Sequence, residues 1–516
     1  MAQHVGELSP DGRWRWDGER WVSAAAAPDT WIDRVASKIT DLRIGRPADW
    51  SVLPMLMVSG ALTDLALRSS RVGIAASLLL ISVCAGLVLT RRVVNPHGIA
   101  ALGPAVLLAA CLSLQQSPWL LLPDLAVVAG LVLVACGIAV EGGLLDLSFA
   151  RAQAHVARTL VHLFVGITFV AGPLRAIGAR LRDERRSQAV AVLRGVLLAI
   201  PVAVLLGWLL TQADAVFASF FRFRSDPLDW SGHAILFAVG ALAAAGLVRA
   251  ASAEPMDVLP RVRWRLGGIE SLVVLVALDL VFAAFTSAQV VAATGAGAAA
   301  IQAHGLTYAE YARSGFFQLL WTAGITLVLL VALRTFVDKS SPIWRRAFVV
   351  AAELAILFTL LIVSVAFQRL RLYVSVYGLS MLRLYCLVFA DWIALVFGAL
   401  GLALTRLGER RQWLPAAMVV TGIAGLLLLN VANPEALVVK YNVAVTEQTQ
   451  RLDPDYLVTL SADAMPALAD AMPSMDGRAR QIVRARLCGG PLFTAPEWTG
   501  FNWSNLAADK ARLQAC

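Results

Sequence analysis

The chain has 516 residues, of which 59% are hydrophobic and 15% charged, with a formal net charge of +9. This composition excludes an ordinary soluble protein, in which about a quarter of the residues are charged. Basic residues fall in short clusters between apolar stretches and do not form one patch, so we expect no nucleic-acid partner. The composition predicts an all-α, polytopic integral membrane protein whose first partners are membrane lipids.

Residues 1–50 form a polar arm rich in tryptophan. It contains no long apolar run, so we expect no cleavable signal peptide. Aromatic and polar residues alternate around Asp17-Gly18, a pattern typical of a hairpin with a two-residue type I′ turn. The segment from Trp16 to Trp21 resembles the Trp-Asp-Gly-x-x-Trp modules at the ends of many actinobacterial membrane proteins. A free hairpin, a disordered aromatic arm and a docking module for a protein partner all stay open.

The next part of the chain, residues 51–433, is a predicted transmembrane helical domain. A helix needs roughly 18–20 apolar residues, each rising about 1.5 Å, to cross about 30 Å of hydrocarbon. Eleven stretches reach or come close to this length: 51–68, 72–90, 98–114, 119–141, 192–213, 230–248, 266–291, 314–336, 345–367, 381–405 and 412–433.

One further segment, 156–175, is ambiguous because its apolar core is short and contains His162 and Pro173. The distribution of arginine and lysine settles the interpretation. The later basic clusters 175–194, 249–265, 334–346 and 406–411 can all lie on one side of the membrane. The basic N-terminal arm and the loop with Arg91 and Arg92 lie on that same side only if 156–175 does not cross. We therefore expect an interfacial or re-entrant segment, a cytoplasmic N-terminus and an extracytoplasmic C-terminus.

Residues 434–516 are predicted to form a small helical domain outside the membrane. Asn433-Pro434 is a helix start, and Pro466, Pro473 and Gly489-Gly490 interrupt the helical spacing that follows. Cys488 and Cys516 are the two cysteines of the sequence outside the apolar spans. In an extracytoplasmic domain they would form a disulfide, although a frayed chain end would leave two separate thiols.

Three carboxylates fall well inside predicted spans: Asp279, Glu353 and Asp391. A charge at that depth costs at least about 2.5–3.5 kcal/mol, so such residues are neutral, hydrogen bonded or functional. Interhelical hydrogen bonding is one interpretation of these acids. A proton relay in a transporter is the other.

The loops between the seventh and eighth spans and between the ninth and tenth are rich in charge, and the predicted topology places both on the outer face. Arginine on the outer face departs from the usual enrichment of basic residues on the cytoplasmic side. It indicates an anionic partner for these arginines, either in an ion-pair network or in an anionic lipid headgroup. Glu310 or Arg313 is predicted to reach Arg371 or Arg383. The full candidate outer-face site is Glu310, Arg313, Arg369, Arg371, Tyr377 and Arg383.

Several stretches resemble a bacterial integral-membrane family known as a domain of unknown function, of the 4153/4173 type. They are LTYAEYARSGFFQL, TQADAVFASFF, QRLRLYVSVYGLSMLRLY, and in the tail KYNVAV, LDPDYLVTLSADAMPAL and FNWSNLAADKARL. The resemblance runs from about residue 50 to the end and implies a polytopic helical protein with a helical tail. It supplies no catalytic residues.

The sequence contains no signature of an enzyme, a metal site or a cofactor site: it has no P-loop, no HExxH, no Gly-x-Ser-x-Gly and no Cys/His pair with suitable spacing. We therefore expect a non-catalytic scaffold, sensor or accessory protein of the inner membrane, with a protein partner at the Trp-rich arm or the outer face. A secondary transporter using the intramembrane acids is the first alternative. A lipid-linked transferase, with Glu310 and the outer arginines holding a phosphate, is the second.

Overall fold

The computed structural model describes most of the chain. The described residues are 14–16, 21–23, 40, 43–46, 48–140, 142–144, 148–166, 169, 227–254, 266–292, 316–337, 341–406, 413–449, 452–490, 492–493 and 497–516. The predicted span 192–213 and the residues Glu310 and Arg313 lie outside them.

The N-terminal arm contains an antiparallel hairpin of β1 (Trp14–Trp16) and β2 (Trp21–Ser23). Trp16 pairs with Trp21, which leaves four residues between the strands. The prediction of a two-residue turn at Asp17-Gly18 is therefore wrong.

The first helix group packs around one hydrophobic core, in which α10 lies along α2. Its members are α2 (Leu53–Arg68, preceded by the 3-10 turn η1, Trp50–Val52), α3 (Ile74–Leu89), α4 (Pro96–Cys111), α5 (Pro118–Gly137), α6 (Phe149–Phe164) and α10 (Pro227–Ala251).

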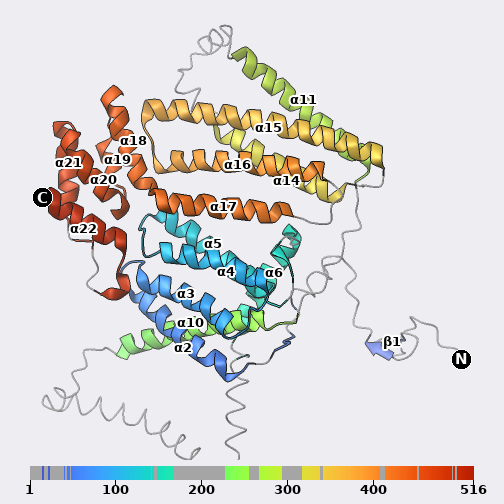
Figure 1. Ribbon diagram of the computed structural model, residues 1–516, viewed down its shortest axis with the longest axis horizontal. Helices are drawn as coiled ribbons and strands as arrows, with labels where there is room; N and C mark the ends of the chain where they lie inside the picture. The colour runs from blue at the N-terminus through green and yellow to red at the C-terminus, as the bar shows by residue number, and fades with distance from the viewer. Residues whose placement is uncertain are drawn as a thin grey trace, which may run out of the picture.

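The second helix group contains α11 (Gly268–Ala292), α14 (Phe316–Phe336), α15 (Pro342–Tyr377) and α16 (Met381–Thr405). Between the two groups lies α17 (Trp413–Ala432), which contacts α16 on one side and α4 and α5 on the other (Figure 1).

In the described part of the chain, eight helices are long and apolar enough to cross a membrane, and α3 and α4 are shorter apolar helices. Ten of the eleven predicted spans coincide with these helices, which confirms a polytopic all-α membrane protein. The side chains facing away from the cores are apolar, as expected for lipid contact: Leu280, Val328 and Val350 are each about two-thirds exposed.

The two ends of the bundle carry different elements. One end, which we call the arginine end, carries Arg43, Arg46, Arg91, Arg92 and Arg249 at the termini of α2, α3 and α10. There Arg92 donates to Asp49 at 2.7 Å and to Ser252 at 3.0 Å. The opposite end carries the C-terminal helices (Figure 1). Exposed tryptophans mark both ends, Trp50 at the first and Trp230 and Trp498 at the second.

Helix α6 covers the start of the ambiguous segment 156–175 and has its polar face inward. His155, Arg158 and His162 are buried, whereas Phe164 is 89% exposed. The Arg158 guanidinium donates to the Glu254 carbonyl at the arginine end. Phe169 lies at that same end, 5.9 Å from the Arg92 guanidinium carbon. Residues 167–168 and 170–175 lie outside the described residues, so the re-entrant path of 156–175 stays a prediction.

Helix α15 is longer than its predicted span 345–367. Its 36 residues continue to Tyr377, about 54 Å of helix, and end where Gly378 adopts a positive φ of 76°. The prediction that Arg369 and Arg371 lie on a loop is therefore wrong. The polar stretch after Phe367 contains no glycine or proline to stop the helix before Gly378.

We call the elements after α17 the C-terminal unit. They are α18 (Pro434–Thr449), α19 (Pro454–Leu457), η3 (Ala462–Ala464), α20 (Met465–Ala471), η4 (Met472–Ser474), α21 (Gly477–Cys488), η5 (Trp498–Gly500) and α22 (Trp503–Ala515). The chain enters it at Asn433, whose φ is 49° and whose side chain accepts from the Ala436 N–H.

The last helix, α22, is held in three ways. The Arg512 guanidinium donates to the carbonyls of Leu487 and Gly490 and lies 4.8 Å from the centre of the Phe493 ring. Cys488 and Cys516 form a disulfide. The covalent link and the buried arginine therefore join the ends of α21 and α22.

We expect Cys488→Ser to lower the free energy of unfolding of the C-terminal unit by about 3–4 kcal/mol, because the bridge closes a loop of 28 residues. The contacts of Arg512 should keep α22 docked, so hydrogen exchange should rise mainly at its last turn. Cys386→Ser, a free cysteine in α16, is the control. Alkylation of both Cys488 and Cys516 in unreduced, denatured protein would contradict the bridge.

Candidate functional site

The arginines predicted at the outer face separate in the structure. Arg369 is half-buried and donates to the Gln289 side chain of α11 at 3.1 Å, whereas Arg371 is exposed on another face of α15. Arg383 turns back onto the end of α15: its guanidinium donates to the carbonyls of Tyr377 and Gly378 at 3.0 and 2.5 Å.

The Arg383 guanidinium also lies 4.4 Å from the centre of the Tyr373 ring, which in turn stacks against Tyr377 at 4.8 Å. Arg383 and Tyr377 are thus brought together as a cap on the C-terminus of α15, where a cation satisfies the last carbonyls of a helix. These contacts occupy the Arg383 head group with protein carbonyls.

Each of the three intramembrane acids lies about ten residues, roughly 15 Å of helix, from one end of its own helix. Asp279 of α11 is buried, and Asp391 of α16 is exposed. Glu353 of α15 lies against Gly401 of α16, where a β-carbon would meet the Glu353 Oε2 at 2.9 Å. No hydrogen bond joins any two of these acids in the structure as described.

A different set of acids meets where the C-terminal unit contacts the membrane helices. Asp463 of η3 is buried, and its carboxylate accepts from the backbone N–H groups of Gln116 and Ser117, each at 2.8 Å. Ser504 of α22 donates its hydroxyl to the same carboxylate. One side chain thus holds the connection between α4 and α5 and the start of α22 together.

Glu435, in the first turn of α18, is buried beside this contact. Its Oε2 accepts from both the backbone N–H and the hydroxyl of Ser461, each at 2.7 Å. Burial raises the pKa of Glu435, and the hydrogen bonds that it accepts oppose part of the rise. Burial also raises the pKa of Asp463, against the bonds from Ser504 and the two N–H groups.

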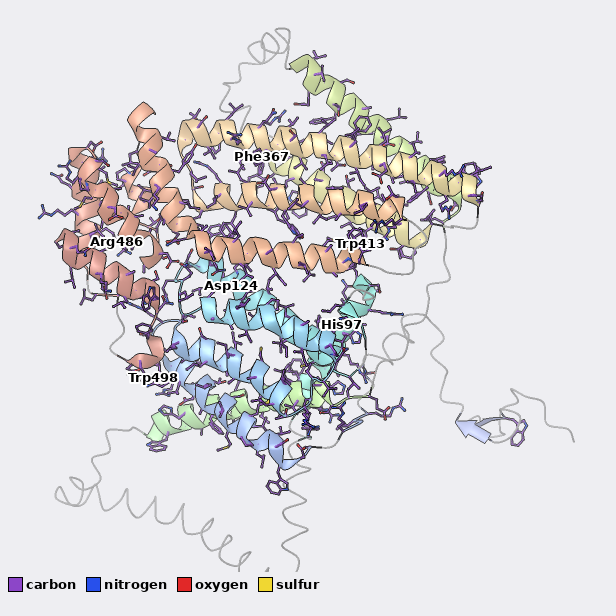
Figure 2. The ribbon with its side chains drawn as sticks, viewed as in Figure 1. His97, Asp124, Phe367, Trp413, Arg486 and Trp498 are labelled. Carbon is purple, nitrogen blue, oxygen red and sulfur yellow. A yellow bond between two sulfur atoms is a disulfide. The ribbon has the colours of Figure 1, made fainter. Side chains whose placement is uncertain are left out.

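A third buried carboxyl, Asp124 of α5, lies beneath this contact. Its Oδ1 accepts from the Asn430 amide of α17 at 3.1 Å. Figure 2 shows Asp124 between the ribbons of α5 and α17. Tyr385 of α16 donates its hydroxyl to the Trp119 carbonyl at 2.6 Å, within electrostatic range of both Asp124 and Glu435. We call Asp124, Glu435 and Asp463 with these partners the carboxyl junction.

Further contacts of the C-terminal unit come from the tail stretches that carry the family resemblance. The Asn502 side chain donates to the carbonyls of Leu112 and Gln115, and the Trp503 backbone N–H donates to the Ser113 carbonyl. On the other helix group, Asn442 exchanges two hydrogen bonds of 2.7 Å with the Leu379 backbone. The Tyr456 hydroxyl accepts from the Met381 N–H at 2.8 Å.

The carboxyl junction was not predicted, although part of its signal is visible in the sequence. Asp124 lies six residues into α5, inside the predicted span 119–141, and an acid in that position is a functional candidate by the same argument that singled out Asp279. Glu435 and Asp463 follow the last predicted span, so the sequence alone indicates exposed acids on the surface of the C-terminal unit. Among the described residues, no group of three or more His, Cys, Asp or Glu side chains is arranged to hold a metal ion.

The fold and the junction define a polytopic, all-α integral membrane protein with a helical unit fixed to one end of its bundle. The chain belongs to the family described as Domain of unknown function (DUF4153), whose model matches residues 102–471. No curated protein and no solved structure matches it. The family match includes Asp124, Glu435 and Asp463 and ends before α21.

We expect Asp463→Ala to weaken docking of the C-terminal unit by about 3 kcal/mol, because two buried N–H groups lose a charged acceptor. Hydrogen exchange measured by mass spectrometry should accelerate in the peptide that contains Gln116 and Ser117. Asp476→Ala is the matched control, since Asp476 caps the exposed start of α21 and accepts from the Ala479 N–H. Equal acceleration in both variants would contradict a clamp specific to Asp463.

The raised pKa values of Glu435 and Asp463 predict how stability depends on pH. Glu435 and Asp463 bind protons more readily when the C-terminal unit is docked than when they are exposed to water. The free energy of docking is therefore most favourable at about pH 4, near the ordinary pKa of a carboxyl group. That extra stability is lost as pH rises through the raised pKa values. The melting temperature in nanodiscs should therefore fall from acid toward neutral pH, and Glu435→Gln should flatten the slope.

Glu497→Gln, an exposed acid at the start of η5, should keep the full slope of the wild type. A melting temperature that rises with pH across the same window would show that the hydrogen bonds to the ionised carboxylates outweigh their burial.

Proposed function

We propose that this protein is a non-catalytic scaffold or accessory protein of the inner membrane, which presents its C-terminal unit in a fixed orientation. One observation supports this above all: the C-terminal unit is attached to both helix groups at the same end of the bundle. Asp463 and Asn502 hydrogen bond to the connection between α4 and α5. The apolar core of the unit is shared with α15 and α16 through Leu370, Val374 and Met381.

Such an attachment opposes a rocking transporter. Alternating access moves one helix group against the other about a central site. A unit joined to the first group by buried hydrogen bonds and to the second by a shared core would have to lose one set of contacts at each cycle. The fixed platform is therefore the function that the contacts favour.

The platform faces away from the cytoplasm in this proposal. The arginine end gathers Arg43, Arg46, Arg91, Arg92 and Arg249, and loops rich in arginine stay on the cytoplasmic side. The C-terminal unit lies at the other end (Figure 1). A disulfide between Cys488 and Cys516 agrees with an oxidising compartment.

A secondary transporter is the second candidate, and one observation favours it. Asp279 Oδ1 and Glu353 Oε1 are buried without a hydrogen-bond partner in the described part of the structure. Unsatisfied carboxyl oxygens at mid-membrane are typical of proton relays. The lipid-linked transferase has less support, because Arg383 already caps α15 and Glu310 and Arg313 lie outside the described residues.

The orientation predicts the activity of reporter fusions. A phosphatase joined after Lys440, in α18, should be active and a green fluorescent protein at the same point should be dark. A phosphatase joined after Arg411, before α17, should be inactive. The reverse pattern would place the C-terminal unit in the cytoplasm and contradict the platform.

The two functions predict opposite results for two sets of variants. Growth competition in the native host, with membrane abundance matched to wild type, should show a defect for Asp463→Ala if the fixed unit is the functional part. Asp279→Asn, Glu353→Gln and Asp391→Asn, tested singly, should compete as wild type. A transporter requires the reverse: loss from a single mid-membrane substitution and tolerance of Asp463→Ala. Asp476→Ala is the control for a general effect on the C-terminal unit.

A further inference from the structure

Asp124 and Asn430 form a pair whose hydrogen bonding is incomplete. Asp124 is fully buried, and Asn430 is 5% exposed. The Asn430 amide nitrogen donates to Asp124 Oδ1 at 3.1 Å and to the Leu426 carbonyl at 3.0 Å. The two remaining oxygens, Asp124 Oδ2 and Asn430 Oδ1, are buried and accept no hydrogen bond from any residue described in the structure.

Two buried acceptors on one pair of side chains require a donor, since each unsatisfied group costs about 1–3 kcal/mol. The titratable groups that interact with Asp124 are Cys111 from α4 and Tyr385 from α16. Neither of them is a cation. An ionised Asp124 would therefore be a buried charge without a positive partner among the described residues, which is costly.

We propose that Asp124 and Asn430 form a proton-binding site. One proton adds to Asp124 Oδ2 and converts the carboxylate to a neutral carboxylic acid; no other bond forms or breaks. The O–H is then a donor, and the Asn430 Oδ1 on the facing side chain is its acceptor. A single proton thus gives both buried oxygens a hydrogen bond and removes the charge of Asp124.

The position of the pair gives the proton a structural consequence. Asp124 belongs to the first helix group, and Asn430 lies on α17, which contacts both groups (Figure 2). Gln115, in the connection held by Asp463, donates to the Asn430 carbonyl at 2.8 Å. Loss of the proton would therefore place a charge directly beneath the docked C-terminal unit. This inference does not depend on the scaffold function.

Infrared difference spectroscopy of the full protein in nanodiscs tests the site. At neutral pH, the spectrum of wild type minus Asp124→Asn should contain one carbonyl stretching band of a protonated carboxylic acid, which shifts in heavy water. Asp453→Asn is the control: this exposed acid caps α19 and should contribute a carboxylate band. A carboxylate band for Asp124 at neutral pH would overturn the proposal.

Sodium is the rival occupant, and it gives a different result. If the carboxylic acid band appears only after sodium is replaced by choline, the site binds sodium and the proposal fails. Asn430→Leu provides a second variant that leaves Asp124 in place. Removal of the amide acceptor should shift the Asp124 carbonyl band, and an unchanged band in that variant would exclude the pairing.

Discussion

The contact between Asp463 and the short connection between α4 and α5 determines how the rest of the molecule is put together. Residues 112–117 turn the chain between two membrane helices and meet α22 through the bond from the Trp503 N–H to the Ser113 carbonyl, and Ser117 is buried there. Buried N–H groups must find acceptors. A carboxylate satisfies both Gln116 and Ser117, and because Asp463 also holds Ser504, the acceptor positions the final helix.

The membrane helices could be predicted because the signal is one-dimensional. Lipid requires a continuous apolar run, and ten such runs, including 119–141 and 412–433, correspond to helices. The end of α15 could not be predicted in the same way. Hydropathy stops at the polar residues near Arg369, whereas the helix continues to Gly378, where a positive φ ends it. Hydropathy identifies only the part of a helix that lies in the membrane, whereas the helix itself can extend beyond the membrane surface.

The carboxyl junction could be predicted only in part, for a different reason. The tail stretches that resemble the family contain Asn442, Asp463 and Asn502, so the sequence identifies the segments that matter. It does not identify their partners. Asp463 lies 347 residues from Gln116, and Asn430 lies 306 residues from Asp124. Such pairings depend on the three-dimensional arrangement of the helices, and propensity or periodicity carries no information about them.

The two kinds of contact made by the C-terminal unit have different physical properties. Its shared core with α15 and α16 is apolar, non-directional and tolerant of small shifts. Its bonds to the connection between α4 and α5 are buried, directional and costly to leave unmade. The unit also forms directional hydrogen bonds with the second group, between Asn442 and Leu379 and between Tyr456 and Met381, so movement between the helix groups would break polar contacts on one side or the other. Buried carboxyls at that polar contact, and Asp124 beneath it, place proton binding at the point where the two groups are joined.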